Sequence, residues 1–212
     1  MPIPGPNRSG PSLRGQRARS ALATLLAFAL CGCSFDLGSL SSISEKSESP
    51  KPAPTSAATT EAQAVTTRAQ TLARSGKTEE ALAAFNNAIE IDPNNADALY
   101  GRGLLYQGEK QHQLAVDDFT AANGLRPQQA EPLLGRAASY LALNKVREAG
   151  TDLDEAAQDD PQNAQIWTTR GLLYERLGDK AKAAESYARA INLRPKDEAA
   201  RTGFARVAGR SG

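Results

Sequence analysis

Apolar residues of two sizes recur with a fixed spacing of 34 residues between positions 65 and 190 of the chain. Large residues form three columns: Val65, Leu99, Leu133 and Trp167; Leu72, Tyr106, Tyr140 and Tyr174; Phe85, Phe119, Leu153 and Tyr187. Small residues form three more: Ala69, Gly103, Ala137 and Gly171; Ala81, Ala115, Ala149 and Ala183; Ala88, Ala122, Ala156 and Ala190. A proline closes each period, at Pro93, Pro127, Pro161 and Pro195. No insertion breaks the phase, so the pattern predicts four repeats, at 62–95, 96–129, 130–163 and 164–197.

Each repeat is expected to form two antiparallel helices, at about 63–75 and 78–91 in the first repeat. A small residue at Gly103, Ala137 or Gly171 lets the second helix approach closely, and the large residues fill the space between helices. The closing proline donates no N–H and ends the second helix. One helix pair cannot bury its apolar face alone, whereas a stack of at least three can. The predicted fold class is an all-α solenoid of four helix-turn-helix repeats.

These columns closely resemble the tetratricopeptide repeat, most clearly where Trp167, Gly171 and Tyr174 are followed by Tyr187 and Pro195. The first repeat departs from that pattern with Val65, Ala69 and Leu72, and the third has Leu153 where an aromatic residue is more usual. The resemblance implies a protein that binds another protein or peptide.

The segment after the last repeat, 198–208, continues the phase, but Arg201 stands where a large apolar residue belongs. This polarity predicts a helix that caps the stack and faces solvent. Residues 209–212 are expected to fray.

Composition argues against several classes of function. The net charge of +1 over 212 residues does not suggest a nucleic-acid-binding protein. The chain has one histidine, His112, and two cysteines, Cys31 and Cys33, both near the start, so the repeats lack ligands for a Cys/His zinc site and a cysteine nucleophile. The acidic pairs at 117–118 and 159–160 have no nucleophile or histidine beside them. We therefore expect no enzymatic activity, cofactor, metal or small-molecule substrate.

The N-terminal segment has the features of an export signal. Arg14, Arg17 and Arg19 precede an apolar run at 21–30, and residues 1–32 contain no acidic residue. As a helix, a run of ten residues rises about 15 Å, half the thickness of a bilayer core, so it is too short to span a membrane. A basic stretch, a short apolar stretch and then small residues indicate a secretory signal peptide.

The end of that signal resembles a bacterial lipobox, because Leu30 and Gly32 precede Cys33 at the expected spacing. The resemblance implies lipid attachment at Cys33, and more than one acyl chain makes a stable anchor. Cys31 is a second candidate, but Leu30 is too large for the position next to the cleaved bond. Simple secretion after cleavage nearby is the alternative. Residues 33–61, rich in Ser, Pro, Thr and Ala, are expected to form a disordered tether.

An arginine recurs once per repeat, at Arg68, Arg102, Arg136 and Arg170. These residues are either a basic ladder for an acidic ligand or partners of acids within the repeat. Asp118 and Asp152 lie sixteen residues after Arg102 and Arg136, on the facing helix, which favours internal Arg–Asp pairs. Repeat four offers only Glu185 or Ser186 at this phase.

The first helices of the repeats are expected to line a concave groove that receives a partner. The predicted partner-binding residues are Tyr100, Leu104, Leu134, Ala138, Leu141, Leu172, Glu175 and Arg176. The apolar residues among them would form a strip suited to an amphipathic helix or an apolar peptide. Leu104 and Leu172, each followed by another leucine, are the most open to an alternative assignment to the core.

Some eukaryotic relatives grip chaperone C-termini with a basic carboxylate clamp. The residues at its repeat positions in this chain are Thr66, Gln70, Gly101, Glu131 and Gly135, or, one repeat later, Tyr100, Leu104, Gly135, Gln165 and Thr169, so the clamp is absent.

The sequence-based hypothesis is therefore a lipid-anchored interaction scaffold that faces the bacterial periplasm. Ser34 follows the anchor, which under the familiar sorting tendency indicates the outer membrane. The chain resembles lipoproteins that help assemble pilus or secretion systems and scaffolds that recruit peptidoglycan enzymes. A structural role through self-association is a further alternative.

Overall fold

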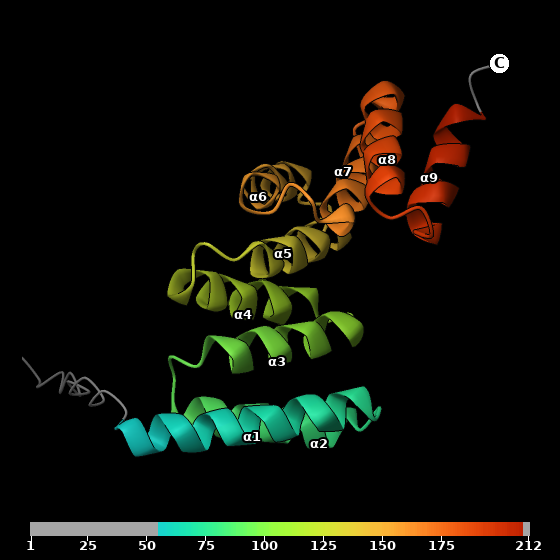
Figure 1. Cartoon of the computed structure of the whole chain (residues 1–212). Helices are drawn as coiled ribbons and strands as arrows, with labels where there is room; N and C mark the ends of the chain where they lie inside the picture. The colour runs from blue at the N-terminus through green and yellow to red at the C-terminus, as the bar shows by residue number, and fades with distance from the viewer. Residues whose placement is uncertain (1–54, 210–212) are drawn as a thin grey trace, which may run out of the picture. The chain divides into compact units, whose positions relative to one another are not determined.

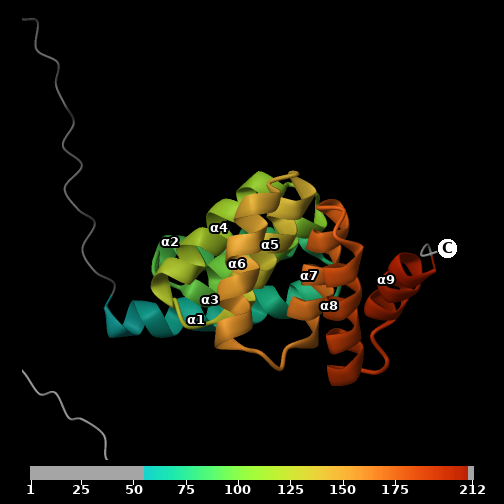
Figure 2. The ribbon, with the colours of Figure 1, turned by 90° about the horizontal axis from the view of Figure 1, so that it is seen from above.

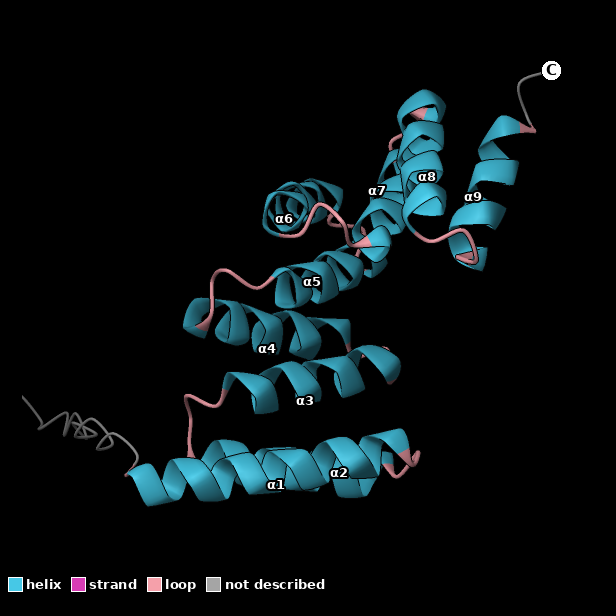
Figure 3. Cartoon of the chain, viewed as in Figure 1, coloured by secondary structure: helices cyan, strands magenta, loops and turns pink. Residues whose placement is uncertain are grey.

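The computed structural model describes residues 55–209, and every element in that range is an α-helix (Figures 1 and 3). The helices are α1 (Ser56–Arg74), α2 (Thr78–Ile91), α3 (Ala96–Gly108), α4 (His112–Leu125), α5 (Ala130–Ala142), α6 (Val146–Asp159), α7 (Ala164–Arg176), α8 (Lys180–Leu193) and α9 (Glu198–Ala208). The predicted fold class, an α-solenoid of helix pairs followed by a further helix, is confirmed.

The turn between the two helices of each repeat depends on one residue with positive φ. Gly76 and Gly178 have φ of 74° and 76°, and Lys110 and Asn144, at the same place in their repeats, have φ of 60°. The next residue donates its backbone N–H back across each turn, as Lys77 does to the carbonyl of Leu72 at 3.0 Å. Such left-handed residues end helices abruptly, which allows the second helix to fold back along the first.

Polar side chains fix where several first helices begin. Asn95 Oδ1 accepts a hydrogen bond from the backbone N–H of Ala98 at 3.0 Å, and Asn163 and Asp197 cap α7 and α9 in the same way. A cap of this kind satisfies a backbone donor that has no partner within the helix. Each cap follows a closing proline, so the boundary between repeats is defined locally.

The helices stack in chain order, and the two members of each repeat pack most closely. Each odd-numbered helix also contacts the next odd-numbered helix, whereas no two even-numbered helices in residues 55–209 contact each other. Neighbours lie closest on the inside of a curved stack, so the odd-numbered helices line the inside of the curve. α9 lies beside α8 at the C-terminal end of the stack, where it also contacts α7 (Figure 2).

Aromatic rings bridge consecutive repeats in the core. Phe119 on α4 is fully buried and packs against Gly103 of its own repeat and Gly135 of the next. A Cβ added at Gly103 would lie 2.9 Å from the ring, and one at Gly135 would lie 2.7 Å from it, so neither position has room for a side chain. Tyr187 bears the same relation to Gly171 and to Gly203 of α9. The ring thus fills the space that two glycines leave.

One predicted boundary is wrong. The tether was expected to extend to residue 61, but α1 begins at Ser56, seven residues before the helix predicted to start at 63. Thr55 caps it, because its Oγ1 accepts a hydrogen bond from the N–H of Ala58 at 3.3 Å. The predicted signal at 1–32, the lipid site at Cys33 and the tether up to residue 54 lie outside the described residues.

Candidate functional site

The candidate interaction surface, called the inner surface below, is the exposed side of α1, α3, α5 and α7. Two of its predicted residues, Leu104 on α3 and Leu172 on α7, each have 42% of their surface exposed. Ala138 on α5, between them along the stack, is half-buried. Exposed leucines at equivalent positions of two repeats are candidate contacts for a partner.

The apolar strip predicted along this surface is interrupted, because Leu134 and Leu141 are buried. They are 8% and 5% exposed and belong to the core cluster around α5 and α6, together with Ile166 and Leu173 of repeat four. Since Ile166 and Leu173 belong to α7, the packing of α7 against α5 accounts for the burial of these positions. The two leucines most open to assignment to the core, Leu104 and Leu172, are instead the exposed ones.

A hollow of about 310 Å³ lies on the inner surface beside Tyr100, the remaining predicted residue of the strip. It is lined by residues from successive odd-numbered helices, including Gln70 of α1, Asp97 of α3 and Glu131 of α5. The Tyr100 ring packs on Phe119 with centroids 5.8 Å apart. Burial, and secondarily the Glu131 carboxylate, raise the pKa of Tyr100, so its hydroxyl keeps its proton and can donate a hydrogen bond.

The charges around this hollow are partly paired. Asp97 accepts hydrogen bonds from both terminal nitrogens of Arg126, at 2.6 and 3.1 Å, in an exposed ion pair. Glu131, which also lines the hollow, is exposed. The hollow therefore offers a tyrosine hydroxyl and acidic groups, which suit a polar or basic side chain of a partner.

Two predicted contact residues lie at the end of α7. Glu175 is bound to Arg206 of α9, whose Nη2 lies 2.9 Å and Nε 3.0 Å from the carboxylate oxygens. This pair holds the last helix against repeat four, so Glu175 has a structural role that was not predicted. Arg176 is exposed.

The predicted Arg–Asp pairs are present. Arg102 donates from Nε and Nη2 to the two carboxylate oxygens of Asp118 at 2.8 and 2.7 Å, and Arg136 binds Asp152 at 2.8 Å through both atoms. In each pair, hydrogen bonding to the aspartate raises the pKa of the arginine. Because these two guanidinium groups bind aspartates within their own repeats, they do not form a basic ladder for an acidic ligand.

The same arginines also connect adjacent repeats, a role that the sequence analysis missed. Nη1 of Arg102 donates to Asn86 of α2 at 2.8 Å, and Nη1 of Arg136 donates to Thr120 of α4 at 3.1 Å. Both acceptors lie sixteen residues before their arginine, so the regular spacing could have revealed them. Each guanidinium thus joins three helices.

The small-residue column behaves as predicted, since Gly103 and Gly171 face aromatic rings and Ala137 is fully buried. A second column, containing Gly101, Gly135 and Gly203, was not recognised, although it also faces the rings. Its signal in the sequence was the spacing of 34 residues between Gly101 and Gly135 and of 102 between Gly101 and Gly203.

Residues 55–209 contain no group of three or more His, Cys, Asp or Glu side chains placed to hold a metal ion. No helix in this range combines the length and the apolar character needed to cross a membrane.

Comparison with known proteins identifies the repeats. Models of the tetratricopeptide repeat match residues 69–109, 96–129 and 134–198. Together with the stacked helix pairs and their small-residue columns, these matches show that the chain belongs to the tetratricopeptide repeat family.

Relatives from different organisms match the repeats over part of their length. Human tetratricopeptide repeat protein 13 is 31% identical over 130 residues, a match that covers 59% of this chain but 15% of that protein. The type IV pilus assembly protein PilF of Pseudomonas aeruginosa is 28% identical over 120 residues, covering 56% of this chain and 48% of PilF. The chain thus spans half or less of the length of these relatives.

Solved structures share the fold. A structure of Pseudomonas aeruginosa PilF superposes with a TM-score of 0.65 and 24% identity, covering 70% of this chain and 68% of that one. The first tetratricopeptide domain of Spaghetti (RPAP3), bound to the HSP90 peptide SRMEEVD, superposes with a TM-score of 0.53 and 22% identity, covering 56% of this chain and 94% of that one. Both superpositions show that the repeats have the tetratricopeptide fold.

Proposed function

We propose that this protein is a non-enzymatic scaffold that receives a protein or peptide partner on its inner surface while lipid-anchored to the bacterial outer membrane and facing the periplasm. The observation that carries the proposal is the row of odd-numbered helices with Leu104 and Leu172 exposed and an acidic hollow at Tyr100 between α1, α3 and α5. Exposed leucines and a polar hollow on the same row of helices suit a partner segment that carries both apolar and polar side chains.

A role in assembling an envelope complex, such as a pilus or secretion system, is the favoured setting. The support is the similarity to PilF, which is a type IV pilus assembly protein, in both sequence and fold. The basic and apolar segment before Cys33 supports the same setting, because it is typical of an exported lipoprotein.

The inner surface is tested by charge substitution. Leu104→Glu and Leu172→Glu should each remove partners that are crosslinked to the full-length protein in cells and quantified by mass spectrometry, because a buried carboxylate opposes an apolar contact. Leu114→Glu on α4 is the matched control, since Leu114 is 46% exposed but lies on an even-numbered helix. If the two inner variants retain the wild-type partners, the inner surface is not the binding site.

The anchor is tested separately. Cys33→Ser should release the full-length protein from the membrane fraction and abolish incorporation of a labelled fatty acid in cells. Loss of labelling in Cys31→Ser but not in Cys33→Ser would move the anchor to Cys31. Absence of labelling in the wild-type protein would refute the anchored form of the proposal.

A further inference from the structure

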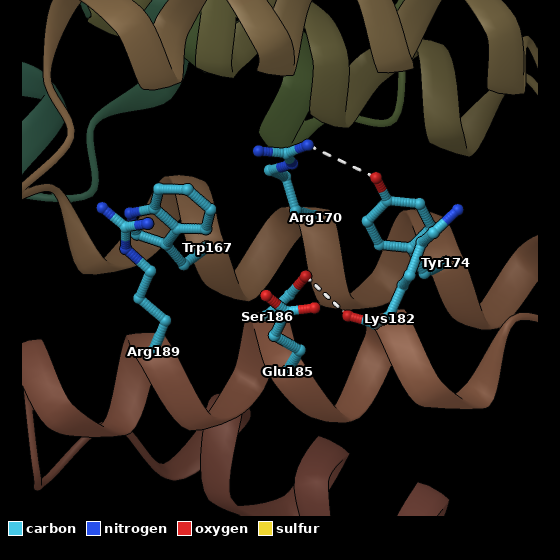
Figure 4. A pocket seen from close by; sticks show the side chains of 7 residues that line it. All are labelled: Trp167, Arg170, Tyr174, Lys182, Glu185, Ser186 and Arg189. Carbon is cyan, nitrogen blue, oxygen red and sulfur yellow. Dashed lines mark hydrogen bonds between the residues drawn. The ribbon is translucent and has the colours of Figure 1, made fainter. Parts of the chain in front are cut away.

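A second candidate site lies between α7 and α8 in repeat four, away from the inner surface. Its side chains ring a hollow of about 210 Å³ (Figure 4). Three of them are cationic, namely Arg170, Lys182 and Arg189, and two are the aromatic rings of Trp167 and Tyr174. One acidic side chain, Glu185, lies on the α8 side of the hollow. The lining is therefore mainly basic and partly aromatic.

Repeats two and three show what normally occupies this place. There, the aspartate sixteen residues after the arginine, Asp118 or Asp152, binds the Nε and Nη2 of that arginine. Both aspartates are buried, so a carboxylate is an integral part of the packing between the two helices.

Repeat four lacks that carboxylate. Ser186 occupies the corresponding position, and its hydroxyl donates to the backbone carbonyl of Lys182 at 2.7 Å. The Nη2 of Arg170 instead lies 2.9 Å from Asp154 of α6 and donates to the Tyr174 hydroxyl at 3.3 Å. Its Nε is buried and has no hydrogen-bond partner among residues 55–209. In Figure 4, Arg170 and Ser186 lie on opposite sides of the hollow.

The remaining cations are held around the same hollow. The Arg189 guanidinium stacks over the Trp167 ring at 3.7 Å from its centroid, and Lys182 lies over Tyr174 at 5.5 Å. Lys182 also pairs with exposed Asp179 at 3.3 Å. Exposed ion pairs of this kind contribute little stability, so Lys182 can exchange its partner readily. In the contact of Arg170 with Asp154, the arginine side chain is 19% exposed and the aspartate side chain is 63% exposed, so water can replace Arg170 at the aspartate more easily than at the buried Asp118 or Asp152.

We propose that this pocket binds a carboxylate of an acidic peptide segment, which takes the place that aspartate fills in repeats two and three. Arg170 would turn from Asp154 towards the incoming carboxylate and offer Nε and Nη2 in the geometry of the Arg102–Asp118 pair. A carboxylate is favoured over a phosphate because the sister repeats accommodate a single carboxylate there and Glu185 disfavours a second negative charge.

The pocket is independent of the proposed inner surface. Successive helical residues are rotated by about 100°, so Trp167, Arg170 and Tyr174 lie on the side of α7 opposite to Leu172. An acidic segment bound here could accompany a partner on the inner surface or act alone, and failure of either site leaves the other intact.

Trp167 provides the readout, because it is the only tryptophan of the chain and lines the pocket. The full-length protein in mild detergent is titrated with an acetylated, amidated tetrapeptide containing two glutamates, while tryptophan fluorescence is followed. Saturable change with this peptide, and none with its glutamine counterpart, is expected. An acetylated peptide with uncharged side chains and a free C-terminal carboxylate, compared with its amidated form, distinguishes a terminal from a side-chain carboxylate.

Substitution at Ser186 gives the decisive comparison. Ser186→Asp supplies the missing carboxylate from within the chain, so it should weaken peptide binding by about tenfold or more and raise the melting temperature. Ser186→Asn introduces a side chain of the same size as aspartate but without its charge, and should retain binding. Unchanged binding in Ser186→Asp, or no saturable response of the wild-type protein to either carboxylate probe, would overturn the proposal.

Discussion

At the scale of single residues, ring size and the size of the facing residues are matched. Phe119 and Tyr187 each insert between two glycines, one in their own repeat and one in the following helix pair or cap. Leu153, the smaller residue of that column, occurs where the equivalent positions hold Ala137 and Thr169 instead of glycine. Close packing makes such compensation necessary, since one added methylene is felt in a dense core.

The first prediction concerns Gly171. Gly171→Leu should lower the free energy of unfolding by about 1–3 kcal/mol or more, because its Cβ would overlap the fully buried Tyr187 ring. Urea unfolding followed by circular dichroism measures the change. Gly124→Leu on α4 is the control: a Cβ there meets nothing within 4 Å, so stability should stay the same or rise. Equal unfolding of Gly171→Leu and wild type would disprove the close approach.

The second prediction concerns the left-handed turns. Lys110 has φ of 60°, where a Cβ is unfavourable, so Lys110→Gly should raise the free energy of unfolding by about 0.5–1 kcal/mol. Gly76→Lys, the reverse exchange at the equivalent turn of repeat one, should lower it by a similar amount. Thermal melts of both variants measure this, and a destabilised Lys110→Gly would contradict the turn geometry.

At the scale of helices, Arg102 and Arg136 connect consecutive repeats. Arg136 on α5 binds Asp152 on α6 and Thr120 on α4, so one side chain fixes two neighbours of its helix. The Arg136 and Asp152 side chains are 15% and 6% exposed, which means that each charge depends on the other for solvation.

The third prediction follows from that dependence. Asp152→Ala should destabilise the protein by roughly 2–4 kcal/mol, because it leaves Arg136 largely buried without a carboxylate. Asp97→Ala removes an Arg–Asp pair whose side chains are 43% and 35% exposed, and should cost less than about 1 kcal/mol. Chemical denaturation compares the two. Similar losses in both variants would show that burial of the Arg136 pair does not matter.

At the scale of the whole array, the sequence predicted what depends on the repeat phase. The helix pairs and the Arg–Asp pairs follow from residues at fixed spacing, and both are present. The sequence predicted less well which side chains of the inner surface are exposed, because their exposure depends on how one repeat packs on the next. That packing buries Leu134 and Leu141, leaves Leu104 and Leu172 exposed, and commits Glu175 to α9. The hollow beside Arg170 was likewise not predicted: the sequence places Ser186 at the aspartate position, but only the structure shows that the space beside the arginine stays open.

The array therefore presents two distinct surfaces, the inner surface with its exposed leucines and the basic pocket of repeat four. Arg102 and Arg136 are bound to aspartates of their own repeats, whereas Arg170 has no such aspartate and lines the pocket together with Lys182 and Arg189. This division suits a scaffold that recognises an apolar segment and an acidic segment separately.

The most direct test of the central claim is site-specific photo-crosslinking in cells that produce the full-length protein. A photoreactive phenylalanine analogue is placed at Leu104, at Leu172 or, as a control, at Leu114, three positions of similar exposure. A scaffold that binds through its inner surface predicts the same discrete protein adduct from Leu104 and Leu172 and none from Leu114. Adducts of equal yield from Leu114, or none from either inner position, would contradict it.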